Sequence, residues 1–109
     1  MTINLNDGFA LKSSSQFERR RKTLPQDVLK ALDSKLKFFS TDAYYPSLNT
    51  KCLRVSGKTL KDLEVDSVWE FYVNRKEYRC IFYVRENEKL IILADIGNHD
   101  QIRRRYGRN

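Results

Sequence analysis

Residues 67–99 constrain the fold most, because three runs rich in β-branched and aromatic residues follow one another with only short polar breaks between them. The runs read SVWEFYV, YRCIFYV and KLIILADIGNH, and the breaks read NRKE and RENE. Runs of this composition, joined by a few polar residues, are typical of strands connected by hairpins. The stretch therefore predicts a three-stranded antiparallel meander.

The first break predicts how the first two strands pair. A four-residue loop over 74–77 places Val73 opposite Tyr78, and the pairs that follow are Tyr72 with Arg79, Phe71 with Cys80 and Glu70 with Ile81. Side chains alternate between the two faces of a strand. One face is then apolar and comprises Trp69, Phe71, Val73, Tyr78, Cys80 and Phe82. The other face is expected to display Glu70, Tyr72, Arg79, Ile81 and Tyr83.

Two helices are predicted before the meander. Ser13, Ser14 and Ser15 offer an N-cap, and Glu18 follows Ser15 at the spacing of a capping box, which indicates a short helix over 16–22. Pro25 suits the first turn of a second helix that ends near 40–42. Its apolar residues recur at helical spacing and are Val28, Leu29, Leu32, Leu36 and Phe39. This stripe is expected to pack on the apolar face of the meander.

The remaining segments carry weaker signals. Residues 9–12 are compatible with a short edge strand, and residues 42–66 read as a largely irregular connection that Leu53 and Val55 anchor or in which they form a short strand. After Gly97, Asn98 or Asp100 is expected to cap a final helix over 99–106. The predicted class is α+β, with two N-terminal helices packed on a small antiparallel sheet in a single domain over 1–109.

The charge of the chain indicates a polyanionic partner. The formal net charge is +7, and basic residues cluster at 19–22 and 103–105. Nucleic acid is the expected partner of such clusters, with solubility as the alternative explanation. No apolar run resembles a signal peptide or approaches the ~20 residues of a membrane span, so a cytoplasmic protein without a membrane partner is expected. Cys52 and Cys80 form no metal or disulfide pattern, and no cofactor is expected.

Several short motifs occur in an order that resembles one family. They are Phe17 before a basic segment, Leu24-Pro25, Trp69-Glu70, Tyr78-Arg79-x-Ile81-x-Tyr83 and Gly97-x-His99-Asp100. In this order they resemble the RelE/ParE superfamily of toxins from bacterial toxin–antitoxin pairs, over roughly residues 9–103. The resemblance implies an antitoxin as partner. It further implies an endoribonuclease that cuts messenger RNA on the ribosome, as RelE, YoeB and HigB do, or else a ParE-like inhibitor of DNA gyrase that performs no hydrolysis.

Three residues are candidates for RNA cleavage. Without a metal, the 2′-hydroxyl must lose a proton, the charge on the phosphorane must be stabilised, and the 5′-oxygen must gain a proton. Arg79 offers planar bidentate donors to a phosphate, and the resemblance places it at the scissile phosphate. His99 is the only histidine and suits proton transfer, whereas Glu70 matches a glutamate that YoeB-like toxins use as a base.

Each candidate also has a purely structural interpretation. Arg79 would pair with Glu70 or Tyr72 across the strands, and His99 would cap the last helix. RelE-type toxins carry two lysines where this chain has Glu70 and Tyr72. Many nucleases of the family have a tyrosine a few residues after the glycine of the last strand, where this chain has Ile102-Arg103, and Tyr106 or Tyr83 is expected to replace it. The expected RNA contacts are Arg103, Arg104, Arg105, Tyr72, Tyr83 and Arg20. The leading hypothesis is a ribosome-associated endoribonuclease toxin. The alternatives are a gyrase inhibitor and a partner-binding domain without catalysis.

Overall fold

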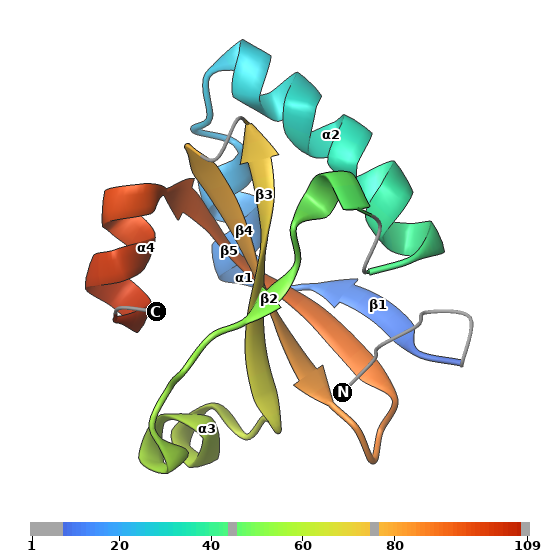
Figure 1. Ribbon diagram of the computed structural model, residues 1–109, viewed down its shortest axis with the longest axis vertical. Helices are drawn as coiled ribbons and strands as arrows, with labels where there is room; N and C mark the ends of the chain where they lie inside the picture. Colours follow the sequence, from blue (N-terminus) through green and yellow to red (C-terminus); the bar gives the residue numbers. More distant parts are fainter. Residues whose placement is uncertain (1–7, 44–45, 75–76, 108–109) are drawn as a thin grey trace.

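The computed structural model describes residues 8–43, 46–74 and 77–107. In chain order the elements are β1 (Ala10–Ser13), α1 (Ser15–Arg21), α2 (Gln26–Thr41), the 3-10 helix η2 (Pro46–Leu48), β2 (Lys51–Cys52), α3 (Gly57–Leu63), β3 (Ser67–Asn74), β4 (Tyr78–Arg85), β5 (Leu90–Asn98) and α4 (His99–Tyr106) (Figure 1). Over these residues the strands form one sheet in the order β1-β5-β4-β3-β2. The α+β class is therefore confirmed. The sheet is not purely antiparallel, because β1 pairs with β5 in parallel.

The meander formed by β3, β4 and β5 follows the predicted register over most of its length. Three of the predicted pairs between β3 and β4 are confirmed, namely Tyr72 with Arg79, Phe71 with Cys80 and Glu70 with Ile81. The prediction that Val73 lies opposite Tyr78 is wrong, because a bulge places Asn74 there instead. A bulge inserts one unpaired residue and shifts the register on one side of it.

A second irregularity lies between β4 and β5. Ile81 pairs with Asp95 and Phe82 pairs with Leu93, so that Ala94 is an extra residue on β5. Leu93 and Ile96 consequently both lie in the core beneath α1 and α2, although strict alternation would place residues three apart on opposite faces. The bulge therefore turns Asp95 away from that core.

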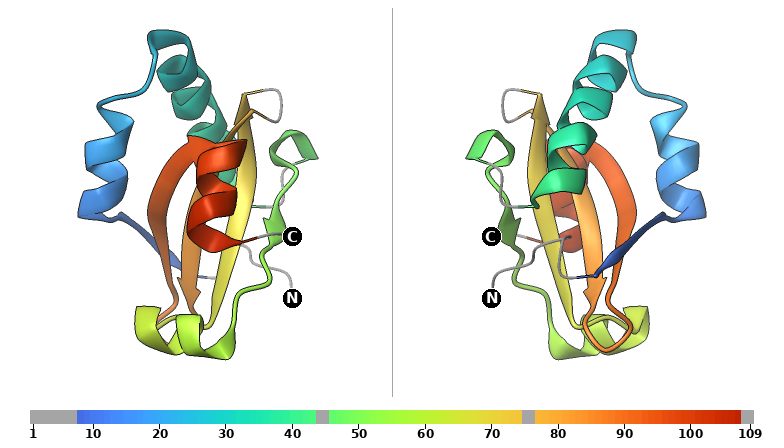
Figure 2. Two further views of the ribbon diagram at one scale, coloured as in Figure 1. Left: turned by 90° about the vertical axis from the view of Figure 1, so that its left-hand side faces the viewer. Right: turned by 90° about the vertical axis from the view of Figure 1, so that its right-hand side faces the viewer.

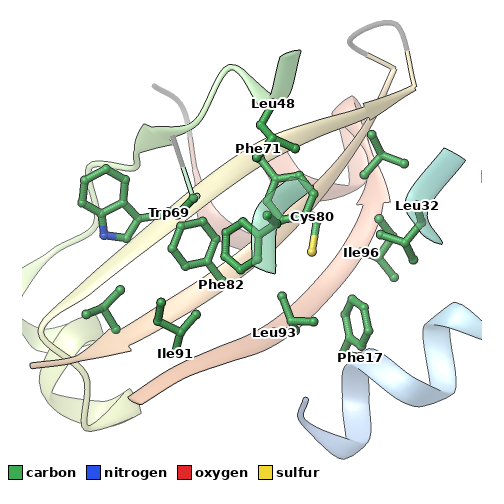
Figure 3. Packing of buried hydrophobic residues seen from close by; sticks show 14 of the residues in the cluster. Phe17, Leu32, Leu48, Trp69, Phe71, Cys80, Phe82, Ile91, Leu93 and Ile96 are labelled. Atoms are coloured by element: carbon green, nitrogen blue, oxygen red, sulfur yellow. The ribbon is translucent and has the colours of Figure 1, made fainter. Parts of the chain in front are cut away.

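The apolar face of the meander is buried as predicted. Trp69, Phe71, Cys80 and Phe82 lie in one cluster with Phe17 of α1 and with residues of α2 (Figure 3). The Phe39 ring packs between Phe71 and Phe82, at centroid distances of 4.9 and 4.8 Å. From the predicted stripe of α2, the fully buried residues are Val28, Leu32 and Phe39. Leu36 packs at the margin of the cluster, and Leu29 is half-buried outside it.

The opposite face of the sheet is less open than the sequence suggested. α4 and α3 lie toward opposite ends of the sheet (Figures 1 and 2), and a second cluster buries Leu53, Val65, Val68, Ile81, Ala94 and Ile102. The expectation that this face displays Glu70 and Arg79 to solvent is wrong, because their exposed fractions are only 3% and 7%.

The connection over 42–66 is also more regular than expected. β2 comprises Lys51 and Cys52 and therefore ends one residue before the predicted Leu53, and it does not include Val55. Ser56 caps α3 by accepting a hydrogen bond from the Thr59 backbone N–H at 3.0 Å. The prediction of a largely irregular connection is therefore wrong over 57–63. Within the described residues, no helix has the length and apolar character required to cross a bilayer.

Candidate active site

The guanidinium of Arg79 is the centre of the candidate site. Arg79 lies on β4, and its Nε is 3.3 Å from Glu70 Oε2 on β3. Its Nη1 is in hydrogen-bond contact with His99 Nδ1, at the start of α4. The guanidinium lies over the Tyr72 ring, with 4.8 Å from Cζ to the ring centroid. The structure thus brings together the three predicted residues Glu70, Arg79 and His99.

Strand pairing explains this arrangement. Tyr72 is the direct cross-strand neighbour of Arg79, and Glu70 lies two residues along β3 on the same face. Lys51 on β2 is directly opposite Glu70, and its Nζ is 3.4 Å from Glu70 Oε2. Two cations therefore share one carboxylate, which leaves a surplus of one positive charge.

Lys51 is the site residue that the sequence analysis missed. The sequence feature that could have identified Lys51 is its two-residue spacing to Leu53, which was already expected to anchor this segment. Residues two apart on an extended chain point to the same side. Both side chains line the same pocket, so an extended conformation over 51–53 would have placed Lys51 there.

His99 occupies the point where β5 ends and α4 begins. The capping interpretation does not apply to its side chain, because Asn98 is the N-cap: Asn98 Oδ1 accepts from the Gln101 N–H at 2.9 Å, and Gln101 Oε1 accepts from the Asn98 N–H at 2.9 Å. The backbone N–H of His99 donates to the Glu77 carbonyl at 2.8 Å. Since arginine can only donate, His99 Nδ1 must accept, and a neutral imidazole then carries its proton on Nε2.

These groups line a pocket of about 190 Å³ between α4 and the strands β2, β3 and β4. Its walls comprise Lys51, Leu53, Glu70, Arg79, His99, Ile102, Arg103 and Gly107. Among these described residues the cations are Lys51, Arg79 and Arg103, and the carboxylate is Glu70. The surplus of positive charge suits a phosphate group, which arginine can bind in a bidentate geometry.

The other predicted RNA-contacting residues have different surroundings. Arg103 lines this pocket, and Arg104 is exposed on α4. Arg20 and Arg105 both bind the buried carboxylate of Asp95, at 2.7 and 3.0 Å from its Oδ1. They lie outside the pocket around Arg79.

The two tyrosines expected to replace the family's tyrosine form a separate pair. The hydroxyls of Tyr83 and Tyr106 are 3.3 Å apart, and the Tyr106 hydroxyl donates to Asp95 Oδ2 at 3.0 Å. Burial raises the pKa of Tyr83. Burial also raises the pKa of Tyr106, and the hydrogen bond to Tyr83 and the charge of Asp95 raise it further. Both phenols are therefore neutral hydrogen-bonding groups at ordinary pH, and neither lines the pocket around Arg79.

The described residues contain no group of three histidine, cysteine or carboxylate side chains arranged to hold a metal ion. Cys80 is fully buried, and burial raises the pKa of its thiol well above the usual value. Cys52 is exposed on β2.

The fold is that of RelE-type toxins. The chain is similar to RelE in an archaeal RelE–RelB complex from Pyrococcus horikoshii, with a TM-score of 0.60, 14% identity, and coverage of 83% of this chain and 93% of that one. It is also similar to the RelBE2 toxin–antitoxin complex of Mycobacterium tuberculosis, with a TM-score of 0.54, 15% identity, and coverage of 84% and 91%. A metal-bound toxin from Helicobacter pylori gives a TM-score of 0.52 at 11% identity, with coverage of 86% and 98%. No protein-family model and no curated protein sequence matches the chain.

Proposed function

We propose that the protein is the toxin of a toxin–antitoxin pair and a metal-independent endoribonuclease that cleaves messenger RNA on the ribosome. The observation that carries the proposal is the contact of Arg79 with both Glu70 and His99 in a pocket with surplus positive charge. The RelE fold supports the same assignment at a coarser level.

We assign to Arg79 the stabilisation of the negative charge that develops in the transition state. When the 2′-oxygen attacks the phosphorus, negative charge develops on the non-bridging oxygens, and a fixed guanidinium can donate to two of them. The ion pair with Glu70 and the cation–π contact with Tyr72 restrain this guanidinium. Lys51 and Arg103 add positive charge at the pocket wall.

His99 and Glu70 are assigned the two proton transfers. In the free protein Nδ1 accepts from Arg79. When a bound phosphate takes over this donor, Nδ1 can take up a proton, and the imidazolium then gives its Nε2 proton to the leaving 5′-oxygen as the P–O5′ bond breaks, which returns the ring to its neutral form. Glu70 is the carboxylate among the described residues of the pocket, and it is assigned the proton of the 2′-hydroxyl. Glu70 also positions Arg79, so Glu70→Gln separates its two roles: the amide retains a hydrogen-bond acceptor but cannot act as the base.

An antitoxin is the proposed protein partner, and messenger RNA and the ribosome are the proposed targets in the cytoplasm. A strongly basic toxin is expected to bind an acidic or amphipathic segment of its antitoxin. The Pyrococcus horikoshii and Mycobacterium tuberculosis structures are themselves complexes of RelE with RelB and of a toxin with an antitoxin.

Single-turnover cleavage of messenger RNA on programmed ribosomes tests the proposal. The wild type should cleave, and an Arg79→Ala/His99→Ala variant should not. Arg85→Ala is the matched control, because Arg85 lies on the same strand at its other end and binds the Glu64 carbonyl and Glu88 instead. If the folded double variant cleaves at the wild-type rate, the site is elsewhere. If the wild type cleaves nothing but blocks supercoiling by gyrase, the protein is a gyrase inhibitor, and if it does neither, it is a binding domain of this fold.

A further inference from the structure

A second cationic cluster lies outside the candidate active site, around Asp95. This carboxylate is completely buried, and its Oδ1 accepts from Arg20 Nη1 at 2.7 Å and from Arg105 Nη1 at 3.0 Å. The Tyr106 hydroxyl donates to the other oxygen, Oδ2, at 3.0 Å. Two guanidinium groups therefore share one carboxylate, which leaves a surplus of one positive charge. Their side chains keep 35% and 30% of their surface exposed, so solvent reaches this surplus charge.

The geometry of α4 separates this cluster from the candidate active site. At 100° per residue, His99 and Arg103 project from one flank of the helix, and Gln101 and Arg105 project from the other. Ile102 lies between the flanks and is buried against the sheet. The helix therefore divides two positively charged hollows, and each hollow has side chains from one flank in its wall.

The second hollow has a volume of about 310 Å³ and lies between α4 and the segment that joins α1 to α2. Arg20, Thr23, Tyr78, Gln101 and Arg105 contribute hydrogen-bonding side chains to its wall. No carboxylate is among its described lining residues, since Asp95 lies behind the two arginines.

Gly97 permits this arrangement. A Cβ atom at this position would lie 2.9 Å from Gln101 Oε1 and 3.1 Å from Arg105 Nη1. Gln101 and Arg105 can therefore approach the backbone of β5 this closely only because residue 97 has no side chain. The buried carboxylate and the glycine together fix the position of the exposed guanidinium groups.

We propose that this hollow binds a backbone phosphate of RNA, at a subsite distinct from the one that holds the scissile phosphate. Two fixed guanidinium groups with a net charge of +1 match a phosphodiester, which carries one negative charge and two free oxygens. The identity of the ligand rests on the proposed function, in which RNA is the substrate. An RNA strand that crosses α4 would place one phosphate against Arg79 and another against Arg20 and Arg105.

Gln101→Glu is the most informative variant. Glutamate has the same shape and is a preferred partner in a capping box, so it can still accept from the Asn98 N–H. It adds a negative charge beside Arg105 and cancels the surplus charge of the hollow. Asn87→Asp is the matched control, because it makes the same amide-to-carboxylate change in the turn between β4 and β5, away from both hollows.

The measurement is the binding of a short single-stranded RNA with 2′-O-methyl groups, followed by fluorescence anisotropy over a range of salt concentrations. This probe lacks the nucleophile and stays intact. The loss of one phosphate contact should make the slope of log K against log salt shallower by about 0.7 for Gln101→Glu, with no comparable change for Asn87→Asp. Arg105→Gln should also make this slope shallower. Lys58→Gln on α3 is its control, because it changes the net charge by the same amount away from both hollows.

Two results would overturn the subsite, and they differ in what they say about the proposed function. If the wild type binds the RNA and Gln101→Glu behaves like the wild type or like Asn87→Asp, the subsite is wrong and the proposed function stands. If the folded wild type binds no RNA, the subsite is wrong as well, and the cleavage assay on programmed ribosomes decides the proposed function separately.

Discussion

Replacing Arg79 by alanine should affect stability and catalysis through two different groups. Glu70 is 3% exposed, and without Arg79 its remaining cationic partner among the described residues is Lys51, at 3.4 Å. Removing one partner of a buried ion pair costs roughly 3–5 kcal/mol. Because Lys51 still balances Glu70, we expect a loss at the low end, about 3 kcal/mol. The catalytic loss should be on the order of 10²–10³ in rate, as for one preorganised donor to developing charge.

A second substitution separates the two effects. In Arg79→Ala/Glu70→Gln the buried carboxylate is gone, so most of the lost free energy of unfolding should return, whereas cleavage should remain as slow as in the single variant or slower. Urea denaturation followed by circular dichroism gives the stability, and single-turnover cleavage on programmed ribosomes gives the rate. Arg79→Lys should restore cleavage only in part, because an ammonium group cannot reproduce the bidentate geometry.

Two outcomes would refute this reasoning. If Arg79→Ala is as stable as the wild type, the ion pair with Glu70 contributes nothing, and the buried carboxylate is balanced in some other way. If the double variant recovers cleavage together with stability, the rate loss in the single variant came from disturbed folding rather than from missing charge stabilisation.

Three further predictions follow from the described contacts. Leu32→Ala should lower the free energy of unfolding by roughly 2–5 kcal/mol, because Leu32 is fully buried in the main cluster; Leu29→Ala should cost less in the same urea titration, and equal losses would contradict this packing. Above about pH 10, where an unfolded tyrosine ionises, the wild type should lose stability because the folded state keeps the raised-pKa phenol of Tyr106 protonated. Tyr106→Phe should lose less between pH 9 and 11, and an identical pH dependence would exclude this cause. Nitrogen NMR of His99, the single histidine, should show that the neutral ring carries its proton on Nε2. In Arg79→Ala the Nδ1–H tautomer should also be populated.

The sequence could predict structure where the determining contacts are local. The pairing of Tyr72 with Arg79 follows from one short hairpin, and the bounds of α4 follow from Gly97 and the Asn98 cap. The pair next to the loop was wrong, since a bulge at the end of β3 cannot be recognised from the alternation of apolar and polar residues. The same locality explains why Glu70 and Arg79 could be placed together in advance.

Contacts between distant segments were harder to predict. The expected edge strand near residues 9–12 exists as β1, but all four of its residues are exposed, and nothing in them indicates parallel pairing with β5, 80 residues later. α3 was missed because residues 42–66 read as a largely irregular connection, although Ser56 is a suitable N-cap residue. The spacing of Lys51 to Leu53 indicates which side of the chain it shares, but its place opposite Glu70 depends on the pairing of β2 with β3, which the local sequence does not indicate.

One inserted residue in β5, Ala94, determines on which face of the sheet the Asp95 carboxylate lies. Strict alternation from Leu93 would point Asp95 into the apolar cluster beneath α1 and α2, where a buried carboxylate without partners would be very costly. The bulge at Ala94 instead turns Asp95 to the face that carries α4, where Arg105 and Tyr106 lie on the same helix. Arg20 reaches the same carboxylate from a position 75 residues earlier in the chain. The bulge therefore couples α1 to α4 through a single carboxylate, and it leaves two partly exposed guanidinium groups, one from each helix, on the side of α4 that faces away from His99.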